Sequence, residues 1–336
     1  MTFLPYITLF SLTLVFGTLL SLSGNQWIFI WMGLELNLMS FIPLLTFSSF
    51  NQESEAAMKY FLAQALGSGL ILLSGLMIQS LPHMTFSHSI INTLLFLGLL
   101  IKLGLPPCHF WFPSVMSKIS WPICILLSTW QKLIPILIIF YTSISSMNPF
   151  ITWIILAASL IGGLGGMNQT QLRPLLAYSS IGHMSWMLAA SVFSYSISII
   201  YFLCYILIST PIMLMFMKFS SSLTSSMSSI STSNFIILPS IFMLLLSLAG
   251  IPPFIGFFPK WMVIQSISMF SPMLLIIILL GSVINLFYYL NLTFISWLKP
   301  MSPPFLGNNP KYGSMSFLSL VAISTLGLGP LVFTII

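Results

Sequence analysis

The most constraining feature of the sequence is a succession of apolar runs, each about as long as a bilayer is thick. A helix that crosses the hydrocarbon core needs about 20 mostly apolar residues. About eleven such runs can be read along the 336 residues, separated by polar, Pro, Gly or Asn interruptions. Only 4% of the residues are charged, whereas a soluble domain is about one-quarter charged. The sequence therefore predicts an all-α polytopic membrane protein.

The runs define the expected spanning helices and the connections between them. Two connections are long, the Ser/Thr-rich residues 219–235 and the Pro/Gly/Asn-rich residues 299–313. Neither is large enough to form a separate domain, so we expect one membrane domain over 1–336. The first run has no basic region and no cleavage site, and is expected to be a retained span. The runs lie near 3–22, 26–46, 57–79, 87–117, 121–143, 149–167, 172–193, 195–217, 236–268, 273–297 and 315–335.

The basic residues predict the orientation of the chain. When the spans are counted from the N-terminus, six of the nine Lys and Arg residues fall on the N-terminal side of the membrane. None falls in a loop on the opposite side. Basic loops stay on the side from which a chain is inserted, so we expect the N-terminus inside and the C-terminus outside. The six residues are Lys59, Lys118, Arg173, Lys218, Lys299 and Lys311.

Several other functions are excluded by the residues present. Nine cations spread over 336 residues cannot form a patch for nucleic acid. The three cysteines stand far apart without a Cys-x-x-Cys pair, which is typical of apolar filler residues. The glycine-rich run 162–166 has no preceding strand, so it indicates close helix packing rather than phosphate binding.

Four ionisable residues lie inside the spans: Glu35, Lys102, Lys132 and Lys260, while the other two acids are assigned to a loop. Each charge at mid-bilayer costs about 2.5–3.5 kcal/mol. A single Lys can extend to the headgroups, and one Glu–Lys pair can simply join two helices. One Glu, however, can neutralise only one of three Lys. A row of ionisable groups in an apolar wall is typical of a proton path.

Two histidines are candidate relays in such a path. His183 lies in the middle of the span 172–193, one turn after Ser179 and Ser180. A buried histidine is often only a hydrogen-bonded core residue, but histidine also exchanges protons near neutral pH. His109 follows Lys102 closely in the sequence and could bridge it to Lys132 through water.

A ten-residue motif occurs twice. Residues 104–113 read GLPPCHFWFP and residues 250–259 read GIPPFIGFFP. Paired prolines remove two amide donors and clash with the carbonyls four residues earlier. The spans 87–117 and 236–268 are therefore predicted to be discontinuous helices, broken near 104–107 and 250–253. Backbone carbonyls that lose their amide donors inside the membrane must accept hydrogen bonds from other protein groups or from water.

The two breaks also predict an internal symmetry. They lie five spans apart, so the two copies cross the bilayer in opposite directions, as in transporters with inverted repeats. The first repeat is expected at about 1–145, the second at about 149–297, and a final helix at about 315–335. One proline kink could serve packing alone; two matched copies, each beside a Lys, favour transport.

The two lysines at the breaks are expected to differ. Lys102 ends a half-helix, where the negative end of the helix dipole favours the ammonium form. Lys260 opens a half-helix, where the positive end favours the neutral amine. A difference in proton affinity between them would allow a conformational change to pass protons in one direction.

These stretches together resemble a known family, the chain 2 subunits of mitochondrial respiratory complex I (NADH–ubiquinone oxidoreductase), which are antiporter-like. The resemblance runs essentially end to end and implies the bacterial fold without its first three helices. It implies that Glu35 pairs with Lys102, that Lys132 continues a central polar axis, and that Lys260 ends the outer half-channel. The matching stretches are WMGLELN, KLGLPPCHFWFP, TWQKLIP, GGLGGMNQTQLR, LAYSSIGHMSWM and GIPPFIGFFPKW.

The chain departs from this family at two positions on the inner side. Vertebrate relatives carry a Glu where this sequence has Ser114, and a Lys where it has Pro174. Proton entry from that side is therefore the part of the resemblance that these residues support least.

The resemblance implies a proton-translocating membrane-arm subunit of the mitochondrial inner membrane, with its N-terminus on the matrix side and its C-terminus on the intermembrane-space side. It implies no redox cofactor in this chain; NADH, FMN, iron–sulfur clusters and ubiquinone are expected in other subunits. The expected partners are those membrane and peripheral subunits and the lipid bilayer, without nucleic acid. A stand-alone cation/proton antiporter and a structural membrane anchor remain as alternatives.

Overall fold

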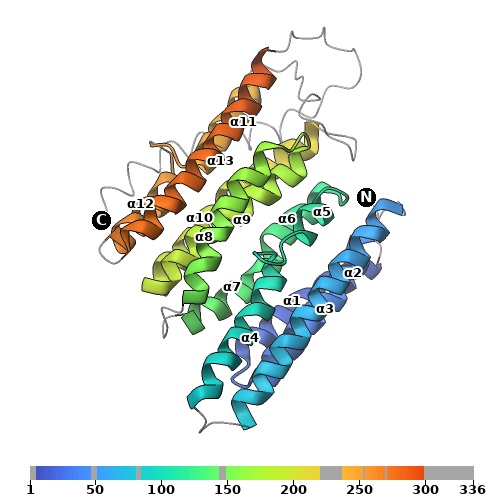
Figure 1. Ribbon diagram of the computed structural model, residues 1–336. Coiled ribbons are helices and arrows are strands. Elements are labelled where there is room, and N and C mark those ends of the chain that lie inside the picture. Colours follow the sequence, from blue (N-terminus) through green and yellow to red (C-terminus); the bar gives the residue numbers. More distant parts are fainter. Residues whose placement is uncertain are drawn as a thin grey trace. The chain divides into compact units, whose positions relative to one another are not determined.

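The computed structural model describes residues 5–46, 51–80, 85–143, 149–219, 237–252, 254–268 and 271–298. This part of the chain is almost entirely helical, which confirms the all-α prediction (Figure 1). The chain divides into two compact units, Met1–Thr142 and Ser143–Ile336.

In the first unit, helix α3 packs against three other helices. It contacts α2, α4 and α5, and α2 in turn packs on α1. The contact between α1 and α2 is close because Gly33 lies against Gly17: a Cβ on Gly33 would sit 2.7 Å from the Gly17 carbonyl oxygen. The described helices are α1 (Pro5–Ser23), α2 (Trp27–Leu45), α3 (Asn51–Ser80), α4 (Thr85–Leu103), α5 (Trp111–Met116), α6 (Trp121–Ser128) and α7 (Trp130–Ser143).

In the second unit, α9 is buried along almost its whole length and contacts α8, α10, α12 and α13. Figure 1 shows α8 and α9 side by side. A Cβ on Gly162 of α8 would lie 2.6 Å from the backbone nitrogen of Gly182, so the glycine run serves close packing as predicted. The described helices are α8 (Pro149–Met167), α9 (Leu172–Phe193), α10 (Tyr195–Phe219), α11 (Ile237–Ala249), α12 (Phe257–Ser268) and α13 (Pro272–Leu298).

The first ten predicted spans correspond to helices or broken helices at nearly the predicted positions. Among the described residues, seven helices are long and apolar enough to cross a membrane, and the shorter apolar helices Ile90–Leu103 and Pro239–Ala249 begin the two broken spans. The span at 315–335, the connection 299–313 and most of the connection 219–235 lie outside the described residues.

The start of α3 differs from the prediction. The helix begins at Asn51, so Glu53 and Glu55 belong to its first two turns and their assignment to a loop is wrong. Acidic side chains stabilise the positive end of a helix, which accounts for the longer helix. Glu53 is 1% exposed.

The predicted helix at 121–143 is interrupted at Thr129. The backbone amide and the hydroxyl of Thr129 both donate to the carbonyl of Ile125, at 3.0 and 2.6 Å. Such a hydroxyl bond bends a helix. Pro135 follows in α7 and has no N–H for the carbonyl of Gln131. The two residues explain why α6 and α7 are separate helices.

Candidate functional site

The first predicted break begins with a defined helix-ending motif. After α4 ends at Leu103, Gly104 has φ +70°, a conformation that glycine adopts without steric cost. The amide of Leu105 donates to the carbonyl of Leu100 at 3.0 Å, and the amide of Gly104 donates to Ile101 at 3.1 Å. These are the two bonds of a Schellman motif. The helix therefore stops at Gly104, just before the paired prolines.

The second break repeats this motif. After α11 ends at Ala249, Gly250 has φ +79°. The amide of Ile251 donates to the carbonyl of Leu246 at 3.4 Å, and the amide of Gly250 donates to Ser247 at 3.1 Å. The two copies of the sequence motif thus form the same backbone structure, and the predicted discontinuous helices are confirmed. Pro253 lies outside the described residues.

Carbonyl groups at both breaks are bonded by side chains, as their depth requires. At the first break, Gln64 of α3 donates to the carbonyl of Lys102 at 3.1 Å, and Trp111 of α5 donates to Ile101 at 3.0 Å. At the second break, the amine of Lys260 donates to the carbonyl of Ala249 at 2.6 Å. Protein groups therefore replace the amide donors that the breaks remove.

Lys102 is buried in the last turn of α4, with 6% of its surface exposed. Its aliphatic stem crosses Gly67 of α3, where an added Cβ would lie 3.0 Å from the Lys102 Cγ. Among the described residues, Glu35 and Lys102 form no direct ion pair within 4.0 Å, so the pairing that the resemblance implies is not a direct contact here.

The close passage of Lys102 over Gly67 predicts the effect of one small substitution. Gly67→Ala is expected to displace the Lys102 stem and to separate α3 from α4, since the same Cβ would also lie 3.0 Å from the Gly98 carbonyl oxygen. The matched control is Gly69→Ala, because a Cβ on Gly69 meets no atom within 4 Å. Thermal inactivation of the assembled protein should occur at a lower temperature for Gly67→Ala alone. Equal midpoints for the two variants would contradict the packing.

Lys132 lies beyond the first break, on α7, and is 2% exposed. Its Nζ is 4.4 Å from the centroid of the Phe112 ring on α5, a geometry in which the ring face attracts a cation. Phe112 also fills the space beside Gly104, where a Cβ would lie 2.7 Å from the Phe112 Cβ. Phe112, an aromatic residue of the repeated motif, therefore lies against both the break and Lys132.

A chain of neutral polar side chains accompanies these ionisable residues. Gln131 donates its amide to the Oδ1 of Asn37 at 3.1 Å and accepts the Tyr60 hydroxyl at 3.3 Å. Asn37 follows Glu35 on α2, and Gln131 directly precedes Lys132 on α7. None of these three residues was predicted. For Asn37 and Gln131 the signal in the sequence was an uncharged polar residue close to a charged one in an otherwise apolar span, whereas Tyr60 had no such signal.

Lys260 is the fourth residue of α12 and is 7% exposed. Its side chain covers Gly250, where a Cβ would lie 2.7 Å from the Lys260 Cδ, and its Nζ is 5.8 Å from the Trp186 ring centroid. The position at the start of a half-helix agrees with the prediction. The amine, however, reaches across the break to the last carbonyl of α11, and the negative end of a helix favours the ammonium form.

His183 lies in α9 and is 5% exposed. Its Nδ1 is 3.1 Å from the Tyr201 hydroxyl, and its ring lies 5.4 Å from the Tyr205 ring. These two tyrosines lie one turn apart on α10 and were not predicted. A narrow, mostly apolar cavity of about 10 Å³ is lined by His183 together with Ser247 and Gly256 at the second break. His183 and the second break therefore border the same small cavity.

His109 lies within the first break and is 6% exposed, between exposed Cys108 and exposed Phe110. Its ring stacks at 4.1 Å from the Phe110 ring. Among the described residues, His109 forms no direct hydrogen bond to Lys102. Its role as a relay would therefore require water between the two side chains.

Outside the spans, the Glu55 carboxylate forms ion pairs with two lysine amines, Lys118 at 2.5 Å and Lys59 at 2.7 Å. The hydrogen bond from Lys118, with that from Lys59, lowers the pKa of Glu55 from 4.5 to about 2. The favourable interaction is therefore complete at neutral pH and is lost as the pH falls from about 4.5 towards 2. All three side chains are partly exposed, so water weakens the attraction. The cluster ties the start of α3 to the segment after α5.

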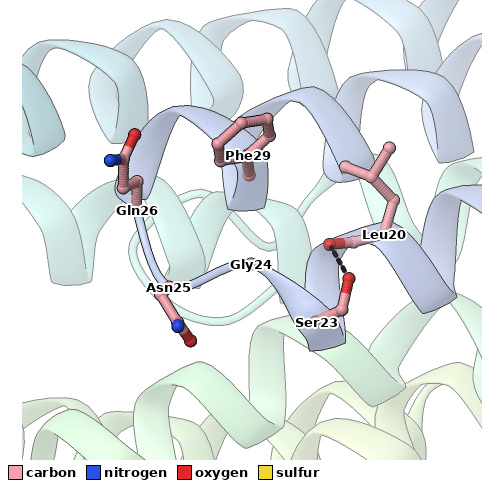
Figure 2. Close-up of a pocket in the computed structure, with 6 residues that line it drawn as sticks. All are labelled: Leu20, Ser23, Gly24, Asn25, Gln26 and Phe29. Atoms are coloured by element: carbon pink, nitrogen blue, oxygen red, sulfur yellow. Dashed lines mark hydrogen bonds between the residues drawn. The ribbon is translucent and has the colours of Figure 1, made fainter.

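A further pocket lies at the turn between α1 and α2, lined by Leu20, Ser23 and Gln26 among others (Figure 2). The Ser23 hydroxyl donates to the Leu20 carbonyl at 3.2 Å. No ionisable residue lines this pocket, so it is separate from the candidate site.

Known proteins share both the sequence and the fold of this chain. Residues 24–285 match the family described as NADH:quinone oxidoreductase/Mrp antiporter, TM. The NADH-ubiquinone oxidoreductase chain 2 of Lumbricus terrestris is 41% identical over 334 residues, covering 98% of each chain. A chain of respiratory complex I from Thermus thermophilus superposes with a TM-score of 0.85 at 23% identity, over 96% of this chain and 78% of that one.

A chain of the Mrp complex from a Dietzia species superposes with a TM-score of 0.84 at 16% identity, over 95% of this chain and 74% of that one. At these identities the two solved structures establish the fold, whereas the sequence match extends over the whole length of the earthworm protein. The chain therefore belongs to the NADH-ubiquinone oxidoreductase chain 2 group of the NADH:quinone oxidoreductase/Mrp antiporter membrane family.

Proposed function

We propose that this chain is a proton-translocating membrane-arm subunit of respiratory complex I in the mitochondrial inner membrane. The oxidation of NADH and the reduction of ubiquinone take place in other subunits, which also carry FMN and the iron–sulfur clusters. The enzymatic activity therefore belongs to the whole complex. This chain contributes proton movement that is coupled to the reaction.

The observation that carries the proposal is the pairing of a buried lysine with each helix break. Lys102 ends the half-helix before the first break, and Lys260 reaches back over the second break to Ala249. A chain that is 4% charged has thus placed two of its nine basic residues where backbone carbonyls are released. The amine of Lys260 also bonds a released carbonyl, but at the first break Gln64 and Trp111 bond the released carbonyls, so packing there does not require the amine of Lys102.

Two of the buried lysines have a neighbour that can bind an ammonium group. Lys132 lies over the face of Phe112, and Lys260 donates to the carbonyl of Ala249. Lys102 is buried at the end of α4, and we propose that Glu35 acts as its acidic partner. We propose Glu35 and the three lysines as the proton-transfer groups, with His183 and His109 as relays.

We also propose an orientation of the chain in the membrane and an internal pair of inverted repeats. The distribution of the basic residues favours an N-terminus in the matrix and a C-terminus in the intermembrane space. The residues at about 1–145 and 149–297 form two inverted repeats around the two breaks, followed by a final helix at about 315–335. The matched Schellman motifs at Gly104 and Gly250 support an internal repeat.

The other candidate functions are a stand-alone antiporter and a structural anchor. The likeness to a chain of the Mrp complex favours a shared fold with that complex. The end-to-end match to a chain 2 relative at 41% identity favours complex I. The function of a structural anchor does not account for the burial of three lysines in a membrane protein.

Replacement of the acid near Lys102 tests the proposal. Glu35→Gln is expected to lower the number of protons translocated per NADH oxidised, because the proposed acidic partner of Lys102 is lost. Glu55→Gln, which removes an acid from the exposed cluster, is expected to leave this ratio unchanged. Both variants are compared as assembled complexes in proteoliposomes. Equal ratios for the two variants would exclude Glu35 from the proton path.

A further inference from the structure

The backbone is unusually weak around the buried residue Lys132. The helix is interrupted at Thr129, three residues before it. Pro135, three residues after it, leaves the carbonyl of Gln131 without its i+4 amide donor. Intrahelical hydrogen bonds therefore hold the first turn of α7 less firmly than the middle of an ordinary helix.

Side chains compensate for this weakness on the residue next to Lys132. The Gln131 amide donates to Asn37 on α2 at 3.1 Å, and its carbonyl oxygen accepts the Tyr60 hydroxyl from α3 at 3.3 Å. Asn37 is 3% exposed and Tyr60 is 1% exposed. Both the amide nitrogen and the amide oxygen of Gln131 are thus held by groups that are themselves buried.

Fixing Gln131 also fixes the direction of Lys132. Consecutive residues of an α-helix point about 100° apart, so Gln131 faces α2 and α3 while Lys132 faces the ring of Phe112 on α5. A rotation of the first turn of α7 would move Lys132 off the ring. The hydrogen bonds of Gln131 oppose such a rotation, because they hold the helix on its other side.

The same contacts connect Lys132 to the first break. The Tyr60 ring meets Trp111 edge to face, with centroids 5.8 Å apart, and Trp111 donates to the carbonyl of Ile101 at the end of α4. A change at the break that moves Trp111 therefore acts on Tyr60, and through it on Gln131.

We propose that Gln131 is a positioning residue for Lys132, held by Asn37 and Tyr60, and that this three-residue bridge makes the placement of Lys132 depend on the state of the first helix break. The inference rests on the proposed role of Lys132 in proton transfer. It assigns a function to three neutral residues that do not themselves take part in proton transfer.

Gln131→Leu removes both hydrogen bonds of the bridge while the lysine at position 132 itself is retained. The measurement is the number of protons translocated per NADH oxidised, in complexes that have assembled to the normal amount. A proton-transfer group that is misplaced loses the geometry that transfer requires, so Gln131→Leu is expected to lower the ratio in the same direction as Lys132→Met. A purely structural role would reduce assembly or thermal stability but leave the ratio of assembled complexes unchanged.

Tyr60→Phe provides a milder variant if Gln131→Leu does not assemble. It removes one hydroxyl and keeps the ring between Phe41 and Trp111, and we expect a partial loss of the ratio. Tyr141→Phe is the matched control, since Tyr141 is 84% exposed on the same helix as Lys132.

The outcomes separate the two proposals. A normal ratio in Gln131→Leu or Tyr60→Phe, together with a lowered ratio in Lys132→Met, would overturn the bridge and leave the proposed function standing. A normal ratio in Lys132→Met would remove Lys132 from the proton path and the bridge with it.

Discussion

Lys102→Met is expected to abolish proton transfer through the first break while the complex still assembles. Methionine has nearly the length of the lysine stem, so the packing of that stem over Gly67 is retained. The variant loses the only group at this position that can accept a proton. A positioned acid or base contributes about 10²–10⁴-fold to a proton-transfer step, and coupled NADH oxidation should slow because this step is blocked.

The measurement is NADH-driven acidification or alkalinisation in proteoliposomes, together with the rate of NADH oxidation. Lys59→Met is the matched control, because Lys59 has the same chemistry but its side chain is 43% exposed in the Glu55 cluster. Normal pumping by Lys102→Met would mean that Lys102 is present for helix packing, and the anchor function would then explain the chain better.

Gly250→Ala is expected to damage the second break through both its backbone and a neighbouring side chain. The residue has φ +79°, where an L side chain costs roughly 1–2 kcal/mol. Its new Cβ would lie 2.7 Å from Cδ and 2.9 Å from Nζ of Lys260, so the lysine side chain must shift, which disturbs its hydrogen bond to the Ala249 carbonyl. We expect a large loss of assembled complex, and loss of coupling in any complex that remains.

A second substitution separates the two causes of this damage. In a Lys260→Ala background the crowded side-chain atoms are absent, and Gly250→Ala should then lower stability only through its backbone strain. Gly69→Ala is expected to have little effect, because the added Cβ meets open space. If Gly250→Ala reduced stability equally with and without the Lys260 side chain, the contact between the two residues would not matter.

The helices and their breaks could be predicted because they depend on local features of the sequence. Apolar runs of membrane length set the spans, and the repeated Gly-x-Pro-Pro set both breaks within a residue or two. The interruption at Thr129 also had local causes, Thr129 itself and Pro135, but the apolar run around them concealed the effect. The early start of α3 at Asn51 could not be read from hydropathy, since its first turns are polar.

The partners of the buried groups could not be predicted in the same way. Which side chain bonds a released carbonyl depends on the packing of helices far apart in the sequence, as with Gln64 and Lys102. The reach of Lys260 back to Ala249 depends on the path of the chain through the break. The lysines were conspicuous because charge is rare here, whereas Tyr60 and Gln131 carry no charge and were overlooked.

The central claim is that buried amines gain and lose protons during turnover, and the vibrations of the amines test it most directly. Infrared difference spectra of the complex in lipid bilayers, recorded before and after NADH addition, can be compared with and without ¹⁵N-labelled lysine. The account predicts label-sensitive ammonium bands that weaken in Lys102→Met, Lys132→Met and Lys260→Met but persist in Lys59→Met. Spectra that are identical in all four variants would contradict it.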